Sequence, residues 1–410
     1  MNALKNLPAG ASANDHAPVS AKAAARQQQR ASNDLRRGEP VVLTTASGDE
    51  AWLILSIEMA TAEDWRGWQA MLGPDTAPSL LLSGERASLL GLEPVPNLVP
   101  LHDQSGQNPI EAGDLVGVLA NLQRQAGLSV DEAEAEKGDT ARASTASPLL
   151  ISAVRLLKRA FLLPAALVWP LNADGRATLD EAGILTLDKA PTADQSAHLV
   201  PPLKMSAARV PLMGAEHSLI SVYRDPVTGR DINVIEVGSM KDDGKITAPP
   251  LVRIHAECFT GDLLNSLKCD CGDQLRGAIK LMAQGSTDGD DAGEDEGTGG
   301  LILYMPQEGR DIGMANKMRS YALQDTGIDT VDANLILGFA VDERDYTSAA
   351  SILVDMGYPE IRLLTNNPDK VASLENRGVQ VTDRVGHKFP PNPHSAAYME
   401  TKRKRTGHDL

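Results

Sequence analysis

The sequence predicts a mixed α/β protein with two domains. Short apolar runs typical of buried strands alternate with amphipathic helical segments. A chain of 410 residues is also long enough for two or three hydrophobic cores. The pattern changes after a stiff double proline, Pro201-Pro202. We therefore expect a disordered tail over residues 1–30, a first domain over 31–203 and a second over 204–410.

The amino-acid composition and the net charge limit the kinds of molecule that this protein could bind. Hydrophobic residues make up 42% of the chain but aromatic residues only 3%, so Leu, Val, Ile and Ala must fill the cores. The net charge of −16 argues against a general nucleic-acid-binding protein, which would show a basic surface. A nucleotide substrate remains compatible, because a local basic pocket can lie on an acidic protein.

The sequence shows no membrane or secretion signal. No run of 18 apolar residues is present, so we expect no spanning segment and no membrane partner. Residues 1–30 are polar and Ala-rich, without the apolar core of a signal peptide. Residues 20–31 could alternatively form a short helix. Free cysteines without such a signal indicate the cytoplasm.

The first domain begins with a helix end, a turn and a strand over 35–43. Thr61 is a predicted N-cap, followed by acids that suit a first helical turn, and its helix extends to about Leu72. A short helix follows Ser83. Further strands are predicted over 51–59, 79–82, 165–170 and 184–187, an amphipathic helix over 149–163, and a polar linker over 131–148.

The start of this domain resembles 3,4-dihydroxy-2-butanone 4-phosphate synthase. The likeness covers about residues 30–100 and rests on a helix followed by an R-x-G-x-P-V strand, R-R-G-E-P-V here. That family needs a dense acidic cluster to hold magnesium, but residues 44–50 offer only Asp49 and Glu50. The resemblance implies a synthase-like domain that has lost its chemistry. The alternatives are an unrelated α/β domain and a bifunctional enzyme that still makes the four-carbon unit.

The second domain should begin with antiparallel strands and then bring a strand to the first cysteine. Strands are predicted over 209–212, 218–223, 233–237, 250–255 and 301–304, with another ending near Thr365, and helices over 273–284 and 316–327. Residues 285–300 are rich in Gly and acids, and we expect a flexible insertion rather than a calcium loop.

All three cysteines fall in one stretch, Cys258, Cys269 and Cys271. Thiolates are natural zinc ligands, and three protein ligands leave a fourth position for water. The spacing therefore favours a catalytic zinc over a closed structural one. The alternative is three buried thiols that merely lie close in sequence.

Together, the motifs of the second domain resemble GTP cyclohydrolase II over residues 204–410. The matching segments read R-I-H-A-E-C-F-T-G-D, S-L-K-C-D-C-G-D-Q-L, Q-E-G-R-D-I-G, Y-A-L-Q-D-T-G-I-D-T, L-G-F-A-V-D-E-R-D-Y and L-L-T-N-N-P-D-K. The resemblance implies a mixed-sheet enzyme that opens the imidazole ring of GTP and releases formate and diphosphate. The product, 2,5-diamino-6-ribosylamino-4(3H)-pyrimidinone 5′-phosphate, feeds riboflavin synthesis. It also implies a homodimer, one zinc per chain, and Mg²⁺ carried by the substrate phosphates.

The resemblance assigns roles to individual residues. Arg344 would attack the α-phosphate, with Asp342 as proton acceptor; an α-phosphate clamp is the alternative, because Arg is normally protonated. Tyr321 would lie near the reacting centre. The expected GTP contacts are Arg253, Glu257, Gln274, Glu308, Arg310, Thr330, Thr365 and Lys370.

Some residues depart from the family pattern, but the three cysteine ligands and the Asp342–Arg344 pair are intact. Met305-Pro306 removes one expected phosphate contact, Asp273 replaces a common aromatic residue, and the acidic insertion lengthens a connection. Two other readings stay open: a non-catalytic nucleotide-binding zinc protein, and a cyclohydrolase for another nucleotide.

Overall fold

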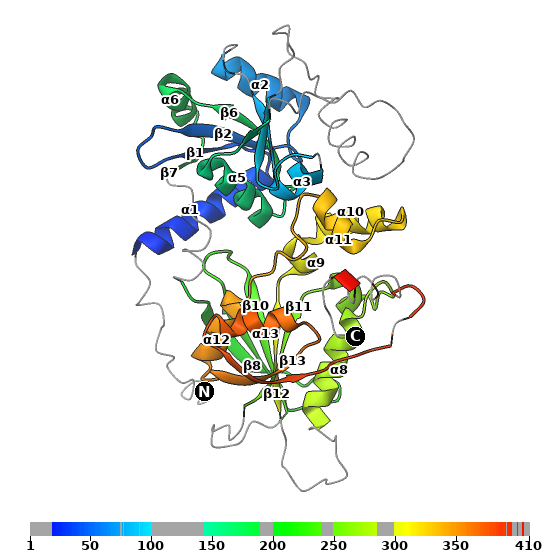
Figure 1. The fold of residues 1–410 in the computed structure, drawn as a ribbon. Coiled ribbons are helices and arrows are strands. Elements are labelled where there is room, and N and C mark those ends of the chain that lie inside the picture. The colour runs from blue at the N-terminus through cyan, green and yellow to red at the C-terminus, as the bar shows by residue number, and fades with distance from the viewer. Residues whose placement is uncertain are drawn as a thin grey trace.

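The computed structural model contains two seven-stranded sheets, drawn one above the other in Figure 1. It describes residues 19–73, 76, 78–89, 91–100, 143–188, 200–238, 249–284, 299–390, 392–395, 400 and 404–405. The first sheet uses strands between residues 41 and 188, and the second uses strands between residues 203 and 385. The predicted mixed α/β class is therefore correct. Most of the predicted linker and acidic insertion, residues 131–142 and 285–298, lies outside the described residues.

The first half is a sheet with helices on both faces. Its elements are α1 (Val19–Arg36), β1 (Val41–Thr44), β2 (Ala51–Ser56), α2 (Ala62–Leu72), β3 (Ser79–Leu82), α3 (Gly84–Leu89), β4 (Asn97–Pro100), β5 (Ser144–Thr145), α5 (Pro148–Arg159), β6 (Ala165–Pro170), α6 (Ala173–Glu181) and β7 (Thr186–Asp188). The strand order is β5-β4-β3-β6-β2-β1-β7, and in it only β1 and β7 pair in parallel.

Strand alternation divides the core of this half between the two faces of the sheet. Leu43 and Ile54 pack with α1 and α5 on one face, while Leu53 and Leu55 pack with residues of α2 and α6 on the other. Helix α2 follows Thr61, the predicted N-cap, whose side chain and Asp64 form a reciprocal capping box.

The second half is a sheet that is parallel at one end and antiparallel at the other. Its elements are β8 (Leu203–Arg209), β9 (Leu219–Arg224), β10 (Asp231–Val237), β11 (Leu251–Ala256), a π-helical turn η3 (Phe259–Leu263), α8 (Cys271–Gln284), β12 (Gly300–Met305), α9 (Glu308–Asp311), α10 (Met314–Asp325), α11 (Thr330–Ile336), α12 (Thr347–Asp355), β13 (Glu360–Leu364), α13 (Pro368–Glu375) and β14 (Gln380–Val385). In the order β14-β13-β11-β12-β10-β9-β8, the first four strands are parallel. Strands β10, β9 and β8 continue the sheet in antiparallel pairing.

Helices cover both faces of this sheet. Residues of α12 and α13 pack on one face against Val252, Leu303 and Ile361, and Ala278 and Met282 of α8 pack on the other. Figure 1 shows α10 and α11, in gold, between the two sheets. These helices therefore adjoin both halves of the chain.

Two expectations from the sequence are wrong. Residues 19–30 belong to helix α1, as in the alternative of a short helix, because Ala25, Ala31 and Leu35 are buried on one face of it; residues 1–18 of the expected tail lie outside the described residues. The strand expected over 209–212 is β8, which ends at Arg209. This edge strand is almost entirely exposed, so it lacks the alternation that identifies a strand.

None of the helices in the described part of the chain is both long and apolar enough to cross a membrane.

Candidate active site

The carboxyl ends of the parallel strands bring the predicted residues together. Cys258 follows the end of β11, Glu308 follows β12, and Thr365 follows β13 directly. In sheets with parallel strands, ligands bind beyond the carboxyl ends of the strands. The site therefore lies where the topology favours one.

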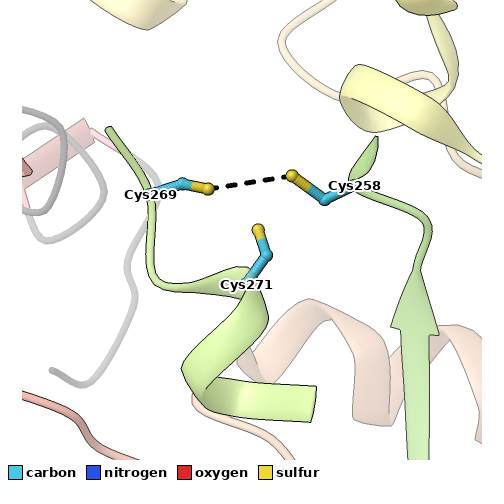
Figure 2. Close-up of side chains that lie close together, drawn as sticks. All are labelled: Cys258, Cys269 and Cys271. Carbon is cyan, nitrogen blue, oxygen red and sulfur yellow. Dashed lines mark hydrogen bonds between the residues drawn. The ribbon is translucent and has the colours of Figure 1, made fainter. Parts of the chain in front are cut away.

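The three cysteine sulfurs converge from two segments (Figure 2). Cys258 is the N-cap that precedes the π-helical turn, and Cys271 begins α8. The sulfurs of Cys258 and Cys269 are 3.7 Å apart, and all three lie within 4.8 Å of one another. Ligands about 2.3 Å from one tetrahedral zinc would have sulfurs about 3.8 Å apart, so this spacing fits a single metal ion.

The backbone around the sulfurs is shaped to keep them close. A Cβ on Gly261 would lie 2.9 Å from the Cys269 sulfur and 3.0 Å from that of Cys258. Gly261 also donates its N–H to the Cys258 sulfur at 3.3 Å. A Cβ on Gly272 would lie 2.2 Å from the Gly261 carbonyl oxygen. Both glycines are thus required for the approach of the two segments, which supports a metal-holding role.

The thiols share charge unequally. Contacts from Cys269 and Cys271, together with the Lys317 ammonium, hold the pKa of Cys258 far below its ordinary value. The contact with Cys258 raises the pKa of Cys269 to about 11, and contacts with both neighbours raise the pKa of Cys271. One thiolate stabilised by two thiols is what three converging sulfurs give without metal; a bound metal would deprotonate all three.

Lys317 connects the sulfur cluster to Glu308. Its Nζ lies 2.7 Å from Glu308 Oε1, 3.0 Å from Cys258 Sγ and 3.1 Å from Thr260 Oγ1. Burial lowers the pKa of Lys317, but the bond to Glu308 and the neighbouring Tyr321 and Cys258 outweigh it and raise that pKa. Glu308 also accepts the Phe259 N–H at 2.7 Å. The lysine is therefore a fixed cation beside the thiolate.

A second network of hydrogen bonds fixes the backbone at Cys258. Asp262 accepts hydrogen bonds from the Cys258 N–H at 3.0 Å and the Tyr304 hydroxyl at 2.9 Å. His255 Nε2 lies 3.1 Å from both Asp262 oxygens, and Arg253 donates to its Nδ1 at 3.3 Å. We assign the ring proton to Nε2, because Nδ1 accepts from Arg253. Burial lowers the pKa of His255, which keeps the ring neutral.

A cavity of about 140 Å³ adjoins the cysteines. It is lined by all the expected metal and GTP-contact residues and by Tyr321 and Arg344, but not by Asp342. The basic side chains on its wall are Arg253, Arg310, Lys317, Arg344 and Lys370; the acidic ones are Glu257 and Glu308. On a chain with a net charge of −16, this local excess of cations suits a polyanion.

Asp342 and Arg344 form a two-bonded ion pair. Arg344 Nε donates to Asp342 Oδ1 at 2.8 Å, and Nη2 contacts Oδ2. Burial raises the pKa of Asp342, but the bonds and charge of Arg344 outweigh it and lower that pKa. Asp342 thus lies outside the cavity wall and orients the guanidinium that lines it.

Arg310 lies in a strained turn. Gly309, Arg310 and Asp311 have φ values of 65°, 63° and 69°, a left-handed conformation that side chains other than glycine seldom adopt. The turn is held because Arg310 Nη1 donates to the Val341 carbonyl at 3.0 Å and Glu343 N–H donates to the Arg310 carbonyl at 3.2 Å. This links the 309–311 turn to the segment that carries Asp342 and Arg344.

The other predicted residues line the remaining walls. Gln274 Oε1 accepts from Arg253 at 2.5 Å, and Lys370 Nζ donates to the Ile254 carbonyl at 3.0 Å. Burial and the charge of Glu308 raise the pKa of Glu257. Thr330 begins α11, and the Tyr321 ring lies 5.6 Å from the Lys317 ammonium.

Sequence reasoning missed several side chains at the site. The sequence gives no signal that Asp262 and Tyr304 belong to the site, and it places Lys317 only within the helix predicted over 316–327. Lys317 lies four residues before Tyr321, so the helical repeat places both on one face of α10. That spacing could have identified it; the contacts of Asp262 come from the tertiary fold.

This chain is similar to known GTP cyclohydrolase II proteins. The family model for GTP cyclohydrolase II matches residues 204–386. A GTP cyclohydrolase-2 of Azospirillum brasilense is 38% identical over 403 residues, covering 94% of both chains. A GTP cyclohydrolase-2 of Acinetobacter baumannii strain AYE is 45% identical over 189 residues, covering 46% of this chain and 87% of that one.

Two further matches are to a second riboflavin-biosynthesis protein and to a solved structure. The riboflavin biosynthesis protein RibBA of Rhodococcus erythropolis is 43% identical over 212 residues, covering 51% of this chain and 46% of that one. A solved structure of RibBX, a two-domain 3,4-dihydroxy-2-butanone 4-phosphate synthase from A. baumannii, covers 88% of this chain and 99% of its own at 15% identity. Its TM-score of 0.26 is too low to support an argument about arrangement.

The A. brasilense match runs through both halves of the chain, well beyond the segment that carries the cysteines. Its identity and coverage, with the family-model match, establish the assignment. The chain belongs to the GTP cyclohydrolase II family of riboflavin-biosynthesis enzymes.

Proposed function

We propose that this chain is a zinc-dependent GTP cyclohydrolase II. It would convert GTP to 2,5-diamino-6-ribosylamino-4(3H)-pyrimidinone 5′-phosphate, formate and diphosphate. The observation that carries the proposal is the joining of a three-cysteine cluster and a cation-rich wall in one cavity. The first suits metal-assisted hydrolysis, and the second suits a triphosphate.

We assign one zinc ion per chain to Cys258, Cys269 and Cys271. A zinc ion bound there supplies a Lewis acid and an activated water for hydrolysis at C8 of the purine. Lys317 balances thiolate charge from 3.0 Å away, and Asp262 fixes the Cys258 backbone. The protein therefore orients the ligand set from two sides.

At the base end, Glu257, Gln274 and Arg253 would contact the guanine. Glu257 has a raised pKa, and Gln274 is held by Arg253 on one side and by Asp270 on the other. Thr365 would contribute a further polar contact. Tyr321 would act near the reacting atoms, because its ring adjoins Lys317, whose ammonium touches the Cys258 thiolate.

At the phosphate end, Arg310, Lys370 and Arg344 would bind the triphosphate together with Mg²⁺ carried by the phosphates. Thr330 would add a contact from the start of α11. The bidentate bond to Asp342 favours Arg344 as a fixed α-phosphate clamp, since a guanidinium in that bond stays protonated. The lowered pKa of Asp342 keeps its carboxylate ionised but makes it a weaker base, which further favours the clamp over the alternative in which Arg344 attacks and Asp342 accepts its proton.

A homodimer is proposed on the family resemblance alone.

No described residue of the first half favours synthase activity. Of the two acids expected there, Glu50 is bonded to the Trp52 indole and the Ser147 hydroxyl at 2.8 and 2.5 Å. Within the described residues, the three cysteines are the one cluster able to hold a metal.

The test is product analysis with purified protein, Mg²⁺ and GTP. One formate and one diphosphate per GTP consumed, with no reaction of ATP, is the expected result. Diphosphate without formate, or no formate from a zinc-loaded preparation, would contradict the proposal.

A further inference from the structure

The first half of the chain contacts the segments of the second half that carry the candidate site. Several polar links cross between the halves, and three of them end on α10, on α11 and on the 340–344 segment. Arg319 Nη2 donates to Glu58 Oε1 at 2.8 Å, and Arg86 Nη2 donates to the Ile336 carbonyl at 2.6 Å. The third link joins Lys158 of α5 to Glu343 at 2.6 Å.

Close backbone packing accompanies these links. A Cβ on Gly313 would lie 2.9 Å from Phe161 Cβ, and one on Gly338 would lie 2.9 Å from Pro164 Cγ. Asn316 also donates to the Phe161 carbonyl at 2.9 Å. Gly313 is the N-cap that precedes α10 and Gly338 follows α11, so the first half fixes both ends of the helical pair drawn in gold in Figure 1.

A buried arginine of the first half makes a specific contact with the second half. Arg86 is 3% exposed, and its guanidinium donates two hydrogen bonds to the Ile336 carbonyl at the end of α11, where a cation is favourable. Its Nη1 has no hydrogen-bond partner among the described residues. An ordinary linker contact would not bury an arginine in this way.

Lys158 makes the link that reaches the candidate reacting pair. Its ammonium lies between Glu85 at 2.9 Å and Glu343 at 2.6 Å, and the lysine side chain is 16% exposed. Glu343 Oε1 also accepts the Ala340 N–H at 2.6 Å, and Glu343 N–H bonds the Arg310 carbonyl. Glu343 stands between Asp342 and Arg344 in sequence.

Removing the ammonium would leave two carboxylates facing each other. Like charges repel, so Glu343 would shift and carry the backbone of its neighbours with it. The first half would then act on the reaction without touching substrate.

We propose that the first half is a positioning domain for the cyclohydrolase site, and that Lys158 is its positioning residue for the 340–344 segment. The inference rests on the proposed function, because the effect on turnover presumes that Arg344 contacts GTP. The effect on the 340–344 backbone does not depend on it.

The experiment compares Lys158→Met, Lys158→Arg, Glu343→Gln, the Lys158→Met/Glu343→Gln double variant and a matched control, Arg155→Met. Arg155 is an exposed cation on the same helix, three residues earlier. For each full-length protein we would measure the kcat and KM of formate release, the zinc content, and hydrogen–deuterium exchange of peptides covering 340–345.

Lys158→Met should lower kcat between about 10-fold and 100-fold with zinc content unchanged, since small misplacements of binding groups cost this much. Exchange in 340–345 should accelerate, Lys158→Arg should restore most of both properties, and Arg155→Met should match the wild type. In the Lys158→Met/Glu343→Gln double variant, kcat should fall no further than in the worse single variant.

Wild-type exchange over 340–345 in Lys158→Met would overturn the proposal, as would an equal loss of kcat in Arg155→Met. If the wild type releases no formate, the proposed function fails; the exchange data alone then decide whether Lys158 positions the segment.

Discussion

Replacing Lys317 with methionine should destabilise the second half strongly. The Lys317 and Glu308 side chains are 8% and 10% exposed and are joined at 2.7 Å. Breaking a buried pair by removing one partner costs about 3–5 kcal/mol, because the other charge stays buried. Glu308 retains two N–H donors, from Phe259 and Gly309, so we expect about 3 kcal/mol.

The assay is urea unfolding in the presence of a chelator, so that bound metal adds nothing to stability. All four tryptophans lie in the first half, at positions 52, 65, 68 and 169. Indole fluorescence therefore follows that half, and far-UV circular dichroism follows the whole chain. Lys280→Met, at an exposed position on α8, is the matched control.

Adding Glu308→Gln should recover part of the loss, because the uncompensated carboxylate is then gone. A loss below about 1 kcal/mol, or one equal to that of Lys280→Met, would refute the reasoning about this pair.

Two further predictions concern titration and phosphate contact. Burial and the charge of Arg253 lower the pKa of His387 to about 4, and its ring bonds the Gln274 carbonyl at 2.7 Å. Because this pKa lies below the ordinary value near 6.5, the stabilisation is present above pH 6.5 and is lost as pH falls to 4, by about 3 kcal/mol. Urea unfolding at pH 7 and pH 4 should show that extra loss in the wild type but not in His387→Gln; equal losses would contradict it. Arg344→Lys keeps the charge but not the two parallel bonds to Asp342, so kcat for diphosphate release should fall about 100-fold. Near-wild-type turnover would remove Arg344 from the reaction.

Much of the sheet framework could be predicted because its signals are local. The buried strands Ser79–Leu82 and Ala165–Pro170 have the predicted bounds, since uninterrupted apolar runs between turns identify them. The sequence predicts helix α1 only as an alternative, because its buried face includes small or polar residues such as Ala25 and Gln28, whose burial depends on partners far along the chain.

The candidate site was predictable in part. The cysteine spacing identified a cluster that could hold a metal ion, and ordered motifs identified the family. The bonds of Lys158 to Glu343 and of Asp262 to Tyr304 join positions 185 and 42 residues apart, so no local pattern encodes them.

The central claim is that the three cysteines hold the metal that opens the guanine ring. The most direct measurement is zinc content and formate release from GTP on the same preparations of wild type and Cys269→Ser. We expect about one zinc per chain and formate from the wild type, with both lost in the variant. Formate release by Cys269→Ser at the wild-type rate, or a zinc-loaded wild type that releases none, would contradict the claim.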